Sequence, residues 1–184
     1  QYLLYPTGPG EKHVLSTGDL ALESTAAFLP DGKRLVITAS EPGHRTRLYL
    51  VDLPDGKPRA FSPDGYRAFS RGVSPDGKFV LAGGPDGRRY LYPIEGGEPT
   101  PIPGLEPDDT PGQWTADGKS LYVFRRRDIP SRVVILDLAT GRKSPWKELA
   151  PADGSGIVDI APVIATPDGA SYVFGYSRTL SDLY

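Results

Sequence analysis

An Asp-Gly pair recurs along the chain and is the first feature that could carry chemistry. The segment "VSPDGKFVL" has three relatives, and the four aspartates are Asp31, Asp76, Asp117 and Asp168. Carboxylates bind calcium, but a calcium loop groups several of them, as in Asp-x-Asp-x-Asp. Here each turn offers one aspartate followed by glycine. We therefore interpret these four residues as structural turn residues, and we predict no metal site and no cofactor.

Other catalytic arrangements are also missing from the sequence. The two histidines, His13 and His44, have no further ligands at the spacing of a zinc site. No cysteine is present, which excludes thiol catalysis, disulfides and thiolate metal sites. No G-x-S-x-G nucleophile elbow occurs, and "DGSGIVD" from Asp153 lacks the lysine of a phosphate-binding loop. We predict that this chain alone is not an enzyme.

Composition narrows the possible partners. The 184 residues carry a net charge of −2, so the sequence indicates no binding to nucleic acid. No apolar run approaches the roughly 20 residues of a membrane helix, and we expect no direct membrane insertion. Both ends lie in strand-like runs ("QYLLYP" and "SDLY"), with no methionine or leader at the start, and we expect an excision from a longer protein.

The elements that position these residues form a repeat. The four aspartates are 45, 41 and 51 residues apart, close to the 40–50 residues of a propeller blade. Each repeat reads as four short apolar strands, and Pro, Asp and Gly in the turns favour hairpins between them. The 22 glycines and 20 prolines fall between the apolar runs. This pattern predicts an all-β fold, a β-propeller or propeller fragment of about four four-stranded antiparallel blades.

Strand order within the repeat predicts the segments of this single domain. Residues 1–27 supply the last two strands of a blade, residues 28–66, 67–110 and 111–160 are full blades, and residues 161–184 begin a further blade. The N-terminal strands could complete the C-terminal blade, although the segment "LSDLY" competes for the third position. The alternatives are a piece of a larger propeller, and a homodimer through open blade edges.

Blade geometry gathers several loops on one face. The loop after the second strand and the loop before the next first strand open on the same side, and loops on a rigid scaffold often carry function. The loops before the first strands contain Glu23, Arg67 and Asp159. We predict that a protein or small ligand binds at this loop face or in the central channel, although a solvated surface would also be charged. The candidate binding residues are His44, Arg45, Arg88, Arg89, Arg125, Arg126, Arg127, Tyr176 and Arg178.

The repeats resemble a known family. "SPDGK" at 74–78, its variants at 29–33, 115–119 and 166–170, and "LYLVDLPDG" resemble the WD-like repeats of TolB-type β-propellers. Ala116 and Ala170 depart from the motif. Among such proteins the chain looks most like the propeller region of bacterial serine/threonine kinases. That resemblance implies a non-catalytic sensor or interaction module in a periplasmic or extracytoplasmic compartment. The alternatives are an accessory propeller that gates a prolyl-oligopeptidase-type peptidase, and a fragment that closes a ring as a dimer.

Overall fold

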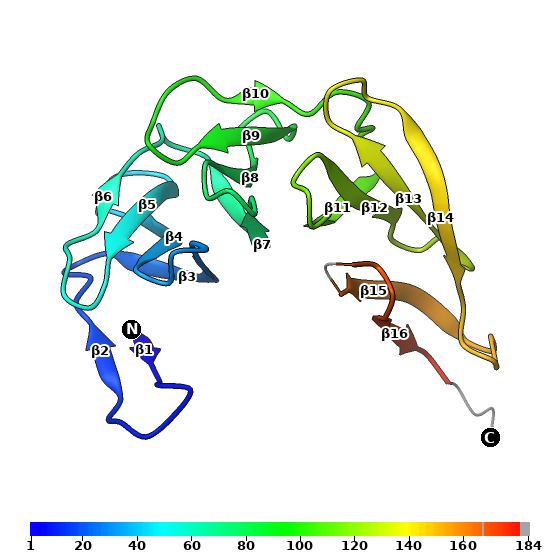
Figure 1. Cartoon of the computed structure of the whole chain (residues 1–184), viewed down its shortest axis with the longest axis horizontal. Helices are drawn as coiled ribbons and strands as arrows, with labels where there is room; N and C mark the ends of the chain where they lie inside the picture. Colours follow the sequence, from blue (N-terminus) through cyan, green and yellow to red (C-terminus); the bar gives the residue numbers. More distant parts are fainter. Residues whose placement is uncertain (167, 181–184) are drawn as a thin grey trace. The chain divides into compact units, whose positions relative to one another are not determined.

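The computed structural model describes residues 1–166 and 168–180, and every regular element in these ranges is a β-strand (Figure 1). The strands form five antiparallel sheets, three of four strands and two of two strands. Within these ranges no helix is long and apolar enough to cross a membrane. The predicted all-β fold with four-stranded antiparallel sheets is confirmed.

Each sheet uses consecutive strands in chain order, as hairpin connections require. The predicted third strand at "LSDLY" lies almost wholly outside the described residues. The five sheets contain β1 (Tyr2–Leu4) and β2 (His13–Leu15); β3 (Ala21–Phe28), β4 (Arg34–Ser40), β5 (Arg47–Asp52) and β6 (Arg59–Ala60); β7 (Arg67–Val73), β8 (Phe79–Gly83), β9 (Arg89–Pro93) and β10 (Thr100–Pro101); β11 (Asp109–Trp114), β12 (Ser120–Arg125), β13 (Ser131–Asp137) and β14 (Lys143–Leu149); and β15 (Ile157–Ala165) and β16 (Tyr172–Arg178).

The first strand of a sheet begins earlier than the sequence pattern indicated. The segments "GDLALEST" and "DGYRAFSRG" contain Glu23 and Arg67 and belong to the predicted loops before the first strands, yet they lie largely in β3 and β7. Pairing of the first strand with the second is interrupted by bulges, for example between Leu22 and Ala26 and between Ala68 and Val73. A bulge breaks the alternation by which a strand is recognised. For the same reason the predicted boundaries at 27/28, 110/111 and 160/161 fall inside β3, β11 and β15.

The recurring Asp-Gly pairs form the turns between first and second strands. At 74–79, Asp76 Oδ1 accepts the N–H of Lys78 at 3.1 Å and the hydroxyl of Ser74 at 2.6 Å. Ser74 Oγ in turn accepts the N–H of Phe79 at 2.9 Å. The glycine after each of the four aspartates has a φ of 65–69°, which glycine adopts without a steric penalty. The corresponding bonds to Asp31, Asp117 and Asp168 measure 2.8, 3.1 and 3.0 Å.

The nearly continuous apolar runs arise because central strands are buried on both faces. In β4, Leu35, Ile37 and Ala39 point into the core shared with β1–β2, and Val36 points into the core shared with β7–β10. The side chains of β5 alternate between the two cores in the same way, and Tyr49 points into the core shared with β1–β2. Successive residues of a strand face opposite sides, so two buried faces remove the polar alternation.

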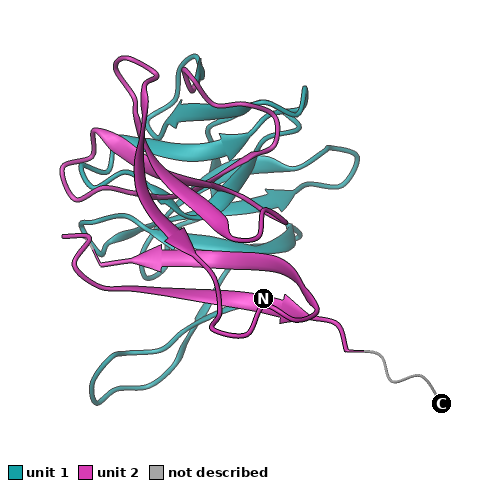
Figure 2. Ribbon diagram, turned by 90° about the vertical axis from the view of Figure 1, so that its right-hand side faces the viewer, with its two compact units in different colours: residues 1–101 teal, residues 102–184 magenta. Residues whose placement is uncertain are grey.

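The chain divides into two compact units, residues 1–101 and 102–184, and each is described by itself (Figure 2). Unit 1 contains the sheets from β1 to β10 and two cores. Unit 2 contains the sheets from β11 to β16 and one core. In that core the ring of Trp146 meets Tyr122 edge-on, with ring centroids 4.7 Å apart. This arrangement gives Trp146 a packing role.

Large exposed apolar side chains gather on the two-stranded sheets. In β1–β2 they are Leu3 and Val14. In β15–β16 they include Val173, which is 60% exposed. In the four-stranded sheets, by contrast, second strands such as β8 and β12 are buried through their centres. The two-stranded sheets therefore present apolar surface that a complete blade would cover.

Candidate functional site

The loop face lies at the end of each sheet opposite the turns of Asp31, Asp76, Asp117 and Asp168. We define it by the segments after the second strands and around the starts of the first strands. In unit 1 these are residues 23–25, 40–46, 65–69 and 83–89. In unit 2 they are residues 106–110, 125–130, 150–159 and 177–178. Each unit has a cavity among these segments.

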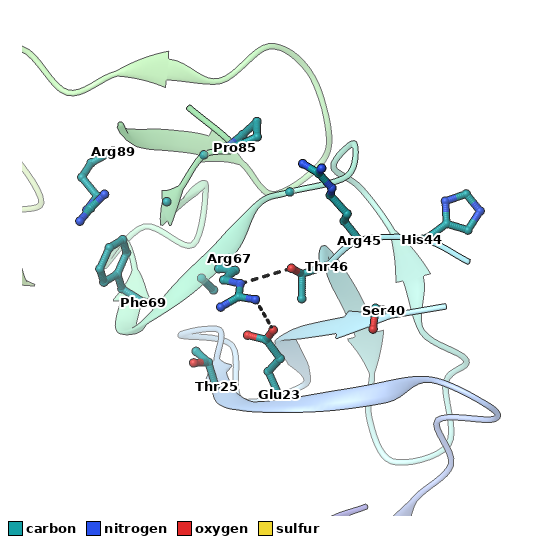
Figure 3. A pocket seen from close by; sticks show the side chains of 14 residues that line it. Glu23, Thr25, Ser40, His44, Arg45, Thr46, Arg67, Phe69, Pro85 and Arg89 are labelled. Carbon is teal, nitrogen blue, oxygen red and sulfur yellow. Dashed lines mark hydrogen bonds and ion pairs between the residues drawn. The ribbon is translucent and has the colours of Figure 1, made fainter. Parts of the chain in front are cut away.

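The cavity of unit 1 is open to solvent and measures about 780 Å³ (Figure 3). Strand β3 and the start of β7 contribute to its wall, as do the loops that follow β4 and β8. Gly65 has a φ of 94° and packs so closely that an added Cβ would lie 2.8 Å from Pro85 Cβ. The lining residues are Glu23, Thr25, Ser40, His44, Arg45, Thr46, Gly65, Arg67, Ala68, Phe69, Gly83, Gly84, Pro85 and Arg89.

Arg67 occupies the centre of the labelled side chains in Figure 3. Its Nη2 lies 3.0 Å from Glu23 Oε1, and its Nε donates to Thr46 Oγ1 at 3.3 Å. Tyr2 donates its hydroxyl hydrogen bond to the backbone oxygen of Glu23. These contacts hold the guanidinium in the cavity with one carboxylate beside it.

Arg89 reaches the cavity from the start of β9. Its guanidinium lies over the ring of Phe69, 5.4 Å from the centroid, and Nη1 donates to the backbone oxygen of Gly87 at 2.6 Å. Its Nε is buried and has no hydrogen-bond partner among the described residues. A buried donor without a partner destabilises the state that contains it by about 1–3 kcal/mol. Arg89 therefore retains unused donor capacity.

Arg45 and His44 lie beside a carboxylate that is held by another arginine. Asp64 accepts a hydrogen bond from Arg47 Nε, the largest cause of the lowered pKa of that carboxyl. Asp64 also accepts the backbone N–H of Arg45 at 3.2 Å, and it lies 3.4 Å from Nδ1 of His44. The Arg45 guanidinium itself has no carboxylate partner in the part of the chain that the structure describes.

The corresponding cavity of unit 2, about 960 Å³, contains the arginine run at 125–127. Arg126 Nε lies 3.1 Å from Asp159 Oδ2, and the backbone N–H of Arg127 donates to Asp159 Oδ1 at 3.3 Å. The hydrogen bond from Arg126 is the largest cause of the lowered pKa of Asp159. Arg127 adopts a φ of 69°, and its guanidinium has no ion-pair partner among residues 1–166 and 168–180. The lining residues are Asp108, Thr110, Arg125, Arg126, Arg127, Asp128, Val158, Asp159 and Ser177.

Arg125, which also lines that cavity, belongs to an ionic cluster with Asp109, Glu106 and Lys143. Asp109, whose side chain is only 4% exposed, lies 3.0 Å from Arg125 Nε and 2.5 Å from Lys143 Nζ. Glu106 also pairs with both cations. Burial raises the pKa of Asp109, but hydrogen bonds from Lys143, the backbone of Glu106 and Arg125 outweigh that effect and lower it overall. The cluster fixes the start of β11 to β12 and β14.

The predicted binding residues therefore divide into three groups. His44, Arg45 and Arg89 line the cavity of unit 1, and Arg125, Arg126 and Arg127 line that of unit 2. Arg88, Tyr176 and Arg178 line neither of these cavities: Arg88 is exposed 3.7 Å from Asp86, and Arg178 pairs with Asp153 at 3.0 Å and lies 5.9 Å from the ring of Tyr176.

The predicted set left out residues that the structure places in the cavity walls. Phe69 and Arg67 were assigned to a loop near the site, although they lie in β7. Thr46 and Pro85 carry no sequence signal for this position. The bulged starts of the first strands, rich in charge, are the pattern that could have identified Glu23 and Arg67.

A metal centre finds no support in the described residues. No group of three or more histidine, aspartate or glutamate side chains there could hold a metal ion. The four turn aspartates bind backbone N–H groups instead, as described above.

Comparison with known proteins shows the fold. No family model and no curated protein matches the chain. Among solved structures, it is similar to a putative TolB of Agrobacterium tumefaciens (19% identity, TM-score 0.64, covering 94% of this chain and 61% of that one). It is also similar to TolB of Acinetobacter baumannii (21% identity, TM-score 0.58, covering 85% of this chain and 44% of that one). A prolyl endopeptidase is a third similar structure (16% identity, TM-score 0.54, covering 87% of this chain and 26% of that one).

The chain thus spans less than two thirds of the length of these structures. At these identities the likeness concerns the backbone arrangement. It shows that the chain is a β-propeller module that resembles TolB-like propellers.

Proposed function

We propose that this chain is a non-catalytic binding module that holds a protein or ligand on its loop face. One observation carries the proposal: each unit forms a solvent-accessible cavity at the same place in the blade architecture, and arginines line both. Arginine offers five donors in a rigid fork and is frequent at protein interfaces. The walls are built on strand ends, which hold these side chains in place.

We further propose that the module is the sensor or interaction region of a larger bacterial protein. The TolB-type repeat motifs support this, and a receptor-type serine/threonine kinase is one such parent. A propeller that gates a peptidase is the alternative, supported by the likeness to the prolyl endopeptidase. The parent gene separates the two: a kinase domain and a membrane helix upstream support the first, and a downstream hydrolase domain supports the second.

The binding role is tested by titrating the ¹⁵N-labelled chain with four defined dodecapeptides, one acidic, one basic, one aromatic and one neutral. We expect at least one peptide to shift amide signals of the loop face in unit 1 or unit 2. The turns at Asp31, Asp76 and Asp117 lie at the other end of the sheets and serve as internal controls. Shifts at those turns alone, or at no residue with any peptide, would contradict the proposal.

Assembly with a second copy is a second candidate, favoured by the two-stranded sheets. Strands β15 and β16 flank an Asp-Gly turn, so they occupy the first two positions of a blade. The segment "QYLLYP" matches "RRYLYP" of β9, a third strand. Pairing β16 of one copy with β1 of another would complete a blade and cover Val173. Light scattering across a concentration series tests this, and a constant mass near 19.8 kDa would exclude it.

A further inference from the structure

Arg89 is placed to hold a ligand that bears a carboxylate. Phe69 lies against its guanidinium and Gly87 holds Nη1, so the group is fixed before any ligand arrives. Its buried Nε has no partner among the described residues. A carboxylate can accept two parallel hydrogen bonds from one edge of a guanidinium. A carboxylate beside this guanidinium would meet a cation that no acidic side chain of the described residues neutralises.

The cavity already accommodates a carboxylate of the protein itself. Glu23 lies 3.0 Å from Arg67 inside the wall, which shows that the site accepts this chemical group. The Glu23 side chain is partly exposed, so an incoming carboxylate can share Arg67 with it. Glu23 then also opposes the ligand, because two negative charges lie close together.

Positive charge exceeds negative charge along the wall of this cavity. Arg45, Arg67 and Arg89 line it with Glu23 as the one carboxylate among its lining residues. Two further carboxylates lie next to the lining and are already paired: Asp64 accepts from Arg47 and from the backbone N–H of Arg45, and Asp86 accepts from the hydroxyl of Tyr90 at 2.7 Å. The surplus attracts anions.

We propose that the unit 1 cavity binds the carboxylate side chains of an acidic peptide segment, with Arg89 as the anchor and Arg67 as the second contact. The three arginines come from three different strands or loops, so they suit several carboxylates spaced along an extended chain. An open cavity of about 780 Å³ also exceeds what one small anion fills. This inference rests on the proposed binding function and specifies its ligand.

Calorimetry with a defined probe tests the anchor. The probe is an acetylated octapeptide in which glutamate alternates with serine, and its matched control carries glutamine in place of each glutamate. We expect Arg89→Gln to weaken binding of the glutamate peptide at least tenfold. Arg59→Gln removes the same charge from an exposed position in β6, outside the loop face, and should change the affinity less than twofold. If both variants weaken binding equally, the effect comes from net charge alone, and the assignment of Arg89 as the anchor is wrong.

A second variant, expected to bind the peptide more tightly, tests the proposal even if Arg89→Gln disturbs folding. Glu23→Gln removes the opposing charge and leaves the side chain nearly the same size. We expect it to tighten binding of the glutamate peptide three- to tenfold. Unchanged or weaker binding would show that the ligand does not approach Arg67.

Mapping by amide shifts separates failure of this inference from failure of the proposed function. If the glutamate peptide shifts signals of the unit 2 cavity instead, the loop face binds but the assignment to Arg89 is wrong. If succinate or inorganic phosphate binds as tightly as the peptide, the site recognises a small anion and the peptide assignment is wrong. If no peptide of any composition shifts the loop face, both proposals are wrong.

Discussion

The loop-face cavities of the two units occupy the same place in the blade architecture, yet they differ in charge. Three arginines line each cavity. In unit 2, Asp108, Asp128 and Asp159 balance them, whereas in unit 1 the balancing group is Glu23 alone. The number of arginines in the loops therefore does not by itself set the electrostatic potential of a cavity. That potential also depends on the carboxylates that the fold places beside the arginines.

The ionic contacts of unit 2 also connect its strands. Removing one of them is therefore expected to have the largest effect on stability. Asp109→Asn leaves Lys143 and Arg125 without their buried partner. We expect the free energy of unfolding of unit 2 to fall by about 2 kcal/mol, since removing one member of a buried pair is destabilising and the more exposed Glu106 compensates only in part. Both tryptophans, Trp114 and Trp146, lie in unit 2, so urea unfolding followed by tryptophan fluorescence measures it.

A matched control uses an exposed pair of the same unit. Glu148 lies 3.5 Å from Arg132, and both side chains are more than half exposed. Glu148→Gln should lower stability by less than about 1 kcal/mol. If it destabilises unit 2 as much as Asp109→Asn does, burial is not the cause of the difference.

Acid should remove part of the same stabilisation. The pKa values of Asp109 and Asp159 are lowered in the folded chain, so their contribution is fully present above the ordinary aspartate value of 3.8. It is lost as the pH falls through their lower folded pKa values. We expect the urea midpoint of unit 2 to drop as the pH falls below 3.8, and to drop less in the Asp109→Asn variant. An equal drop in both proteins would assign the acid sensitivity to other carboxyls.

The charge difference can be narrowed with one substitution. Asp159 is 16% exposed and pairs with Arg126, which is 61% exposed. Asp159→Asn frees that guanidinium and leaves three arginines against Asp108 and Asp128 in the lining of unit 2, so this cavity gains a surplus of positive charge. We expect the variant's unit 2 cavity to bind the glutamate octapeptide at least fivefold more tightly than the wild-type cavity, as measured by amide shifts. No gain would show that cavity shape, not charge, separates the two units.

The smallest expected effect compares one turn in each unit. Ser74 is 2% exposed and its Oγ both donates to Asp76 and accepts from Phe79. Ser74→Ala should destabilise its hairpin by about 1 kcal/mol, the usual contribution of such a bond. Thr115 makes the same bonds in unit 2 with more exposure, and Thr115→Val should have a smaller effect. Exchange rates of the Phe79 and Ser120 amides measure both, and a larger effect at Thr115 would contradict the reasoning.

Much of the fold could be predicted from the sequence because its signals are local. The Asp-Gly turn needs only one carboxylate, one positive φ and a few residues of chain, and it recurs once per repeat. The apolar run of β4 likewise indicates a strand buried on both sides. The bulged starts of β3 and β7 could not be predicted, because a bulge removes the alternation that marks a strand. Glu23 and Arg67 were predicted on the loop face but, because of that error, not among the binding residues.

The sequence by itself determined the all-β class, the period of the repeat, and the face on which the charged loops gather. The arginine run at 125–127 was predicted among the candidate binding residues. The tertiary structure sets Asp109 and Asp159, from other strands, beside Arg125 and Arg126. It left Arg89, another of the predicted binding residues, with a buried Nε that has no partner among the residues the structure describes. Charge pairing depends on distances in space, and those distances are fixed only when separate strands pack together.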